Sequence, residues 1–278
     1  MARALVGLIL VAGLACSPKS AQAQIVAPGG RTIFNRAVMI RSFVRLDNFA
    51  EGVPGVRVRR WVNPYAVVWS PYPHLNLTFV SPLVSVQRET PVDDFTTTSF
   101  SDGFVFARYD LVRHIARRGY TRLSPLVGAK LPTGGAFGNG SVDPIGGLVL
   151  SHVRDPHWLV TDFQFTYTTE GENGLRFGNQ WLYDVAYVYR LLPWGDLDIP
   201  ALYVVVELNG EHERRARLNG ARLANTGGNL VFLSPGIEFM PTNRLVLEFS
   251  SPIPVRRDLN GQQLRPTSSF ILGVRWLF

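Results

Sequence analysis

The chain has 278 residues and a formal net charge of +7 at pH 7, and 46% of its residues are hydrophobic. After residue 23, every stretch of membrane-helix length contains Arg, Lys, Asp or Glu, which excludes helical membrane spans. The arginines are spread along the whole chain without a basic block, so no nucleic-acid partner is expected. The weak positive bias is compatible with anionic partners or solutes.

The first 23 residues are typical of a secretory signal peptide. Arg3 gives a basic start, residues 5–15 form an apolar run too short to span a bilayer, and Ala21-Gln22-Ala23 is an A-x-A cleavage site. The sequence therefore predicts an exported protein, with residues 1–23 removed and residues 24–278 forming one mature domain.

Cys16, the only cysteine, leaves an alternative open. It follows the apolar run and could be a lipoprotein acylation site, although Gly13 stands where such sites normally carry Leu. A mature chain that starts at Gln24 has no disulfide, so it must be held together by its core or by a closed sheet.

The last nine residues alternate between two faces. One face carries Phe270, Leu272, Val274, Trp276 and Phe278, and the other carries Ile271, Gly273, Arg275 and Leu277. A strand with lipid on one side and a lumen on the other must alternate in this way, although a soluble edge strand can also do so. The pattern predicts the closing strand of an outer-membrane barrel, and we expect the barrel-assembly machinery to engage Phe278.

Further segments of strand character precede it. Twelve are found in all, and bacterial barrels have an even number of strands: residues 32–45, 56–69, 74–87, 100–113, 119–130, 144–154, 158–169, 178–191, 200–209, 228–240, 244–250 and 268–278. The sequence thus predicts an all-β protein, a transmembrane up-and-down antiparallel barrel in the cell outer membrane.

The connections agree with this topology. With both termini in the periplasm, links after even strands must be tight turns and links after odd strands must be outer loops. Residues 70–73, 117–118, 155–157 and 241–243 are short links after even strands, whereas residues 131–143, 210–227 and 251–267 are longer links after odd strands. A soluble sandwich has no reason to sort its loops in this way.

Tryptophans are expected at both membrane interfaces. In the predicted register, Trp69, Trp158, Trp194 and Trp276 fall near the turns, and Trp61 and Trp181 fall near the loops. These positions predict two aromatic girdles.

Charged residues share the phase opposite to the apolar face, so we expect them to point into the lumen. The predicted substrate path consists of Lys130, Asp162, Asp184, Arg190, Glu207, Glu238, Glu248 and Arg275, with Asp110 and Arg122 also inward. Two alternatives remain open for these residues. They could line a solvated channel and set its selectivity, or form ion pairs that only make the barrel rigid.

Three motifs, in order along the chain, resemble one known family. They are Gly128-Ala129-Lys130-Leu131-Pro132-Thr133-Gly134, Glu207-Leu208-Asn209-Gly210 and Leu233-Ser234-Pro235-Gly236-Ile237. They resemble the outer-membrane barrel family named for the meta-pathway of phenol degradation, whose members are described as transporters of aromatic or other hydrophobic compounds. An early Gly-Asp element of such proteins appears here in a different form, as Ser101-Asp102-Gly103.

The first motif also has a physical interpretation. Lys130 ends a strand, Pro132 removes a ladder donor, and Gly134 permits a positive φ, so the strand stops and a loop begins. This loop either folds over the barrel mouth or simply terminates the strand.

No catalytic site is predicted. His152 follows Ser151 directly, but neighbours in a strand point to opposite faces and cannot form a nucleophile and base pair. With no mature cysteine and no paired histidines at ligand spacing, neither a metal site nor a cofactor is expected. The sequence therefore favours a passive channel for a small, aromatic or hydrophobic solute, surrounded by outer-membrane lipid and lipopolysaccharide. The alternatives are a barrel enzyme acting on lipids and a structural or adhesive barrel.

Overall fold

The structure, a computed structural model, describes residues 37–50, 52–192 and 200–278. The predicted signal peptide, Cys16, Trp194 and the start of the first predicted strand lie outside these residues. Within the described chain, no helix has the length and apolarity needed to cross a membrane.

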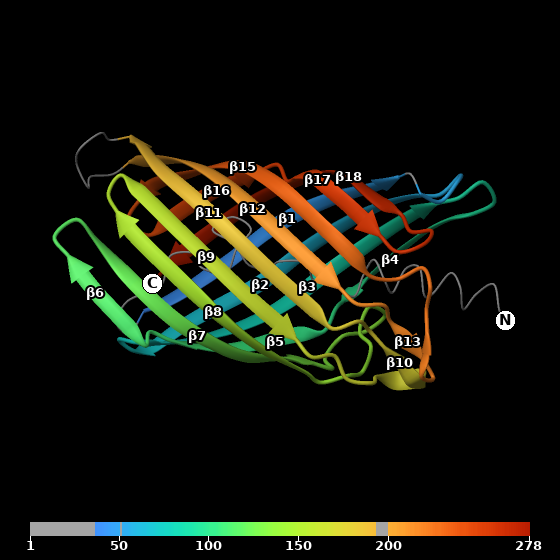
Figure 1. Cartoon of the computed structure of the whole chain (residues 1–278). Coiled ribbons are helices and arrows are strands. Elements are labelled where there is room, and N and C mark those ends of the chain that lie inside the picture. Colours follow the sequence, from blue (N-terminus) through green and yellow to red (C-terminus); the bar gives the residue numbers. More distant parts are fainter. Residues whose placement is uncertain (1–36, 51, 193–199) are drawn as a thin grey trace.

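The chain forms a closed antiparallel β-barrel of twelve strands, whose strong tilt is visible in Figure 1. The strand segments are β1 (Val38–Ala50), β2 (Arg57–Tyr72), β3 (Leu75–Glu89), β4 (Asp94–Phe100), β5 (Gly103–Tyr109), β6 (Val112–Ala116), β7 (Gly119–Leu131), β8 (Asp143–Arg154), β9 (His157–Thr166), β11 (Gln180–Leu192), β12 (Ala201–Glu213), β15 (Gly228–Thr242), β16 (Leu245–Ser250), β17 (Ile253–Leu259) and β18 (Arg265–Leu277).

Two of the twelve strands are interrupted. β4 and β5 both pair with β3, and β5 and β6 both pair with β7, so these three segments act as one strand. β16 and β17 both pair with β15 and form another. The predicted strand count is therefore confirmed.

The barrel closes where its first and last strands meet. β1 pairs with β18 along nearly its whole length, from Met39 opposite Leu277 to Ala50 opposite Arg265. This closure gives each of the twelve strands hydrogen-bonded neighbours on both sides over at least part of its length. Inside a bilayer such pairing is needed, because there is no water to satisfy a free sheet edge.

The predicted alternation of faces is also confirmed. On β18, Leu272, Val274 and Trp276 are exposed, whereas Ile271 and Arg275 are buried. Around the barrel, many large apolar side chains are exposed on the strands, and the buried charged ones point inward. An apolar outer surface over a polar interior is the arrangement that a lipid environment requires.

Short turns lie at one end of the barrel, near β6, and the longer links lie at the other, near β4 (Figure 1). We call these the turn end and the loop end. The predicted turns at residues 117–118 and 155–157 are confirmed, since β6 ends at Ala116 and β7 begins at Gly119, while β8 ends at Arg154 and β9 begins at His157.

The link predicted over residues 251–267 is wrong. β17 continues the barrel wall there by pairing with β15, which leaves a link of residues 260–264. Pro254 had favoured a loop, but it lies opposite Phe232 at a register irregularity, where a missing N–H disturbs the ladder least.

The predicted girdle is wrong at one tryptophan. Trp69, Trp276 and Trp61 are well exposed on the outer face, but Trp158 is buried. Trp158 is an even number of residues from the inward Asp162 on β9, so both side chains point into the lumen. The predicted position of Trp158 along the strand was correct, but the predicted outward orientation was not.

Whether the outer face contacts lipid can be tested by placing a charged side chain on it. Val185 lies in the middle of β11 and is 43% exposed in the absence of lipid. Val185→Arg should lower the free energy of unfolding by about 2–4 kcal/mol, because arginine is costly at the bilayer midplane. Urea unfolding in lipid vesicles measures the change. Val92→Arg, in the exposed link between β3 and β4, is the matched control, and equal effects would contradict a lipid-facing role for this face.

Candidate functional site

All eight predicted path residues lie on the buried, inward face of the barrel. None is more than 6% exposed. The structure also shows which charges and apolar groups surround them. Their role as a solute path stays a prediction.

Four charged side chains join the strands on either side of the seam. Arg41 Nη2 donates to Glu248 Oε2 at 2.9 Å, and Arg275 Nη2 donates to Glu238 Oε1 at 3.0 Å. Arg275 Nε also pairs with Glu248. The four residues come from β1, β15, β16 and β18, which are neighbours around the barrel. This seam network therefore connects four strands, including the first and the last.

The strand register explains why the network has four members. Arg41 lies opposite Arg275, and Glu238 lies opposite Glu248, so each like-charged pair would be unfavourable without the other. A Cβ at Gly273 would lie 2.9 Å from Glu248 Oε2, so the glycine leaves the space that this carboxylate occupies.

A second group of predicted residues forms an acidic wall on β9, β11 and β12. Asp162 lies directly opposite Asp184, and Glu207 lies on the next strand. Asn209 Nδ2 donates to Asp184 Oδ1 at 2.8 Å, and Asn209 Oδ1 accepts a hydrogen bond from Ser234 Oγ at 2.6 Å. Arg108 and Gln164 lie close to Asp162, and Arg41 lies within electrostatic range of Glu207. The interior thus holds an acidic group on β9, β11 and β12 as well as the mixed-charge seam network.

Other inward arginines are also paired. Asp47 accepts hydrogen bonds from Arg45 at 2.8 Å, from Arg60 Nη2 at 2.6 Å and from Ser269 at 2.6 Å. Two further ion pairs follow the same rule: Arg190 with Asp155 at 2.6 Å, and Arg122 with Asp110 at 3.4 Å. Charge in the interior is largely compensated by the barrel itself, so an entering ion would have to compete with existing partners.

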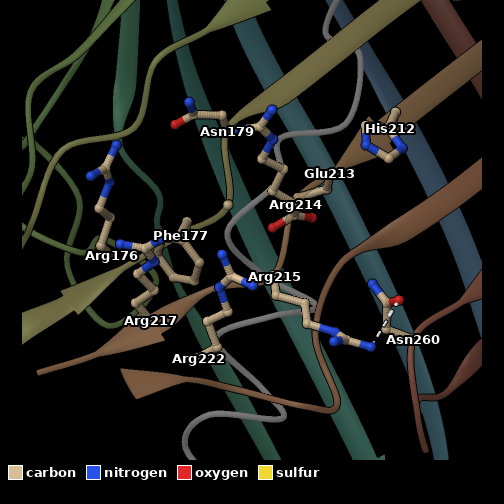
Figure 2. Close-up of a pocket in the computed structure, with 11 residues that line it drawn as sticks. Arg176, Phe177, Asn179, His212, Glu213, Arg214, Arg215, Arg217, Arg222 and Asn260 are labelled. Atoms are coloured by element: carbon tan, nitrogen blue, oxygen red, sulfur yellow. Dashed lines mark hydrogen bonds between the residues drawn. The ribbon is translucent and has the colours of Figure 1, made fainter. Parts of the chain in front are cut away.

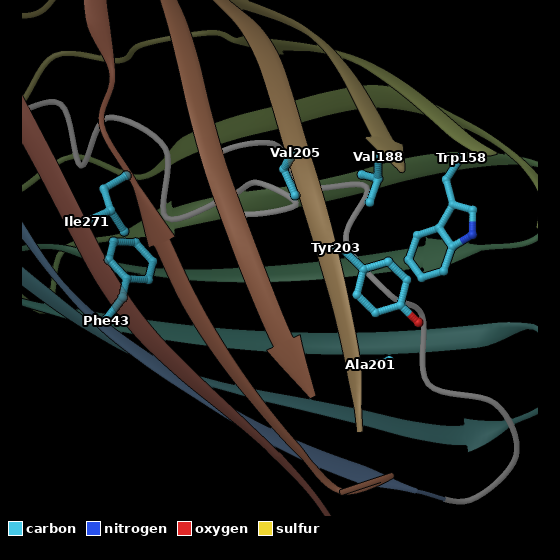
Figure 3. Packing of buried hydrophobic residues seen from close by; sticks show 7 residues of the cluster. All are labelled: Phe43, Trp158, Val188, Ala201, Tyr203, Val205 and Ile271. Atoms are coloured by element: carbon cyan, nitrogen blue, oxygen red, sulfur yellow. The ribbon is translucent and has the colours of Figure 1, made fainter. Parts of the chain in front are cut away.

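Apolar side chains also enter the lumen. One buried cluster contains Phe43, Trp158, Val188, Ala201, Tyr203, Val205 and Ile271. Figure 3 shows Phe43 and Ile271 together on one part of the wall, with Tyr203 and Trp158 on another. The rings of Trp158 and Tyr203 lie 4.9 Å apart between centroids. This lining is suited to contact with apolar solutes.

Residues 132–142, which we call the mouth loop, link β7 to β8 at the loop end of the barrel. Its base is fixed by Lys130, whose Nζ lies 2.9 Å from Asp143 Oδ2 and 3.2 Å from Asp102 Oδ2. Asp102 also accepts hydrogen bonds from the backbone N–H groups of Gly134 at 3.0 Å and Asn139 at 3.2 Å. The Lys130 motif and the Ser101-Asp102-Gly103 element are therefore in direct contact.

The mouth loop places a phenylalanine in the barrel. Phe137 is only 4% exposed and packs in a cluster with wall residues from β1, β2 and β3: Phe49, Val58, Val62, Val84 and Val86, together with Leu264. Of the two alternatives for the Lys130 motif, the structure has the loop folded over the mouth. A loop residue thus shares a buried cluster with the inner side of the wall at this end.

Several of these residues were missed from the sequence. Arg41 and Asp47 have the same parity on β1, so the period-two pattern contained the signal for an inward charge. Asp102 and Phe137 had no comparable signal, because they lie at a strand interruption and in a loop, where periodicity does not apply.

No family model and no curated protein matches the chain. Several solved structures match the chain. The COG4313 outer membrane channel from Pseudomonas putida F1 has a TM-score of 0.69 at 14% identity, covering 91% of this chain and 100% of that one. The transport unit of the autotransporter AIDA-I from Escherichia coli has a TM-score of 0.52 at 11% identity, covering 98% of both chains. The β domain of the Bordetella autotransporter BrkA has a TM-score of 0.51 at 13% identity, covering 87% and 99%.

At these identities the likeness shows the fold alone, which is that of outer-membrane β-barrels. The resemblance to the meta-pathway family stays a prediction that rests on the motifs.

The seam network should be a major contributor to stability. Arg275→Gln leaves Glu238 and Glu248 buried with one cation fewer, and breaking a buried ion pair costs about 3–5 kcal/mol. Urea unfolding of the refolded barrel measures this loss. Arg256→Gln is the matched control, because Arg256 and Asp258 form an ion pair with side chains 60% and 70% exposed. That pair should contribute only about 0–1 kcal/mol, and similar losses in both variants would refute the role of the seam network.

Asp102 should control the order of the mouth loop. Asp102→Ala removes the acceptor of two loop N–H groups and one partner of Lys130, so the Gly134 and Asn139 amides should exchange with solvent faster. Hydrogen exchange followed by mass spectrometry measures this. Asp258→Ala, which removes an exposed carboxylate, should leave the loop unchanged. Unaltered exchange in Asp102→Ala would show that the loop is held by other contacts.

Proposed function

We propose that the protein is a gated outer-membrane channel for the passive passage of small compounds, and that the mouth loop is its gate. The observation that carries this proposal is the position of Phe137, a loop residue that is buried against the inner side of the wall at the mouth. A loop anchored through a few polar groups can move without disturbing the strand ladders of the barrel.

The fold likeness to the Pseudomonas putida channel supports this proposal, because it extends over the whole of that chain. Two of the other matches are an autotransporter transport unit and an autotransporter β domain, in which the same kind of barrel also belongs to a transport protein.

The solute class follows from the lining. Inward charges are paired with one another, while Phe43, Trp158 and Tyr203 form an apolar surface beside them. At these ion pairs a small ion would lose its hydration without gaining an unpaired partner, whereas an aromatic or hydrophobic compound would gain apolar contacts at the aromatic lining. We therefore propose aromatic or hydrophobic compounds as solutes, with Lys130, Glu207, Glu238 and Glu248 shaping the choice among them.

An enzyme acting on lipids has no observation in its favour. Two described histidines bond to hydroxyls other than serine: His152 Nδ1 lies 2.8 Å from Thr121 Oγ1, and His157 Nδ1 lies 2.7 Å from Tyr187 Oη. Neither arrangement supplies a serine nucleophile with a base.

A disulfide can lock the gate. An ideal Cβ on Gly135 in the mouth loop would lie 3.8 Å from the Cβ of Ser99 on β4, which matches disulfide geometry. In proteoliposomes, uptake of a small aromatic compound through Ser99→Cys/Gly135→Cys should be at background when the protein is oxidised and should recover on reduction. Ser99→Cys alone is the control and should not respond to redox state.

The outcomes separate the two parts of the proposal. Equal uptake in the oxidised and reduced double variant would refute the mouth loop as gate. An absence of uptake by the wild type, the reduced double variant and Phe137→Ala would refute the channel itself. Phe95→Ala, the same change at an outward site on β4, controls for loss of a loop-end phenylalanine.

A further inference from the structure

A second, smaller sheet lies at the loop end, outside the barrel wall. It consists of β10 (Leu175–Arg176), β13 (Arg217–Leu218) and β14 (Ala221–Arg222), in that order. β13 and β14 are joined by Asn219 and Gly220, whose φ angles of 49° and 82° are the positive values that a two-residue hairpin turn of this type needs. The sheet is therefore a defined element and not an irregular loop.

Three arginines lie side by side across this sheet. Arg217 is directly opposite Arg176 on one side and directly opposite Arg222 on the other. Like charges at directly opposed positions destabilise a strand pair, so a short sheet that places three of them in one row is unfavourable by itself. A bound anion would remove this repulsion.

Arg214 and Arg215 extend the row into a pocket. All five arginines line a cavity of about 400 Å³, in which Glu213 is the one acidic lining residue that the structure describes. Figure 2 shows the five side chains entering it from different segments, with His212, Asn179 and Asn260 at its edge. This volume lies within the range of small-ligand sites.

The five pocket arginines differ from the lumen arginines in their ion-pair partners. In the described part of the chain none of the five forms an ion pair, and Arg215 donates a hydrogen bond to Asn260 Oδ1 at 3.3 Å. Arg41, Arg60 and Arg275 in the lumen, by contrast, all pair with carboxylates. Glu213 is the one described carboxylate in the lining, so five cationic groups outnumber the acidic ones and an external anion would supply the remaining counter-charge.

Aromatic rings hold two of these guanidinium groups. Arg176 lies over the Tyr167 ring at 4.9 Å, and Arg214 lies over the Trp181 ring at 5.2 Å. Stacking uses the flat face of a guanidinium group and leaves its N–H edge available for a bidentate contact with a phosphate.

The position of the pocket indicates where a ligand would come from. The Trp181 ring packs in a tilted arrangement against Phe165 at 5.0 Å and His212 at 5.3 Å between centroids, forming an aromatic group at the loop-end boundary of the outer face. Such groups sit at the lipid headgroup level, so a pocket beside them is within reach of headgroup phosphates as well as of dissolved ones. We propose that this arginine pocket binds phosphate groups, carried either by lipopolysaccharide in the surrounding leaflet or by a free phosphorylated compound.

Binding should be measured by calorimetry on the full chain in a neutral detergent. The probes are tripolyphosphate, as a free source, and bisphosphorylated lipid A, as a lipid source, with dephosphorylated lipid A for comparison. Arg176→Gln/Arg217→Gln/Arg222→Gln should weaken binding by about tenfold or more, because charge-assisted contacts to phosphate are lost. The variant should fold, since it removes repulsion within the small sheet.

A matched control removes the same charge from the other end of the barrel. Arg117→Gln/Arg118→Gln/Arg244→Gln changes three exposed arginines at the turn end and should bind as the wild type does. Weaker binding in the pocket variant alone supports the proposal. If that variant loses affinity for both tripolyphosphate and bisphosphorylated lipid A, the pocket is a general phosphate site. If the wild type binds lipid A but not tripolyphosphate, the ligand is a lipid. The proposal is overturned if the wild type binds neither probe, if both variants lose binding equally, or if dephosphorylated lipid A binds as tightly.

Discussion

Closure of the sheet at the β1–β18 seam is the constraint on which the other features depend. In a bilayer no water is present to form a hydrogen bond with an unpaired backbone N–H or C=O group, so the first and last strands must pair along their length. Once they do, every residue faces either lipid or lumen. The apolar side chains of β18 then have to point outward, and Arg275 has to point inward. The polar interior is thus a consequence of the closed wall.

An interior that receives charges in this way must also neutralise them. Register puts Arg41 beside Arg275 and Glu238 beside Glu248, and the two like-charged pairs stabilise each other across the strands. Such a lumen differs from that of a wide water-filled pore, in which charged groups are solvated. Phe43 and Tyr203 add apolar side chains to the same interior.

Sequence alone predicted the features that depend on period two. The faces of β18 and the inward phase of Glu207 and Glu248 are local properties of single strands. Trp158 was assigned to the wrong face, because a tryptophan near an interface can lie on either side of the wall. Contacts between Asp102 and Lys130, and the entry of Phe137 into the mouth, join segments distant in sequence. No periodic pattern encodes such contacts, and the same holds for the row formed by Arg176, Arg217 and Arg222.

The interruption between β4 and β5 gives the barrel wall and the mouth loop a shared boundary. Beyond it, Phe100 O accepts a hydrogen bond from Gly135 N at 2.9 Å, and Ser99 Oγ accepts one from Ala136 N at 3.1 Å, so the loop occupies the side of β4 that no barrel strand covers. If the loop lifts, β4 becomes a free sheet edge. Such an edge is stable only where water can bind its free N–H and C=O groups. The part of β4 that lies above the lipid therefore limits how far down the wall the opening made by a displaced mouth loop can extend.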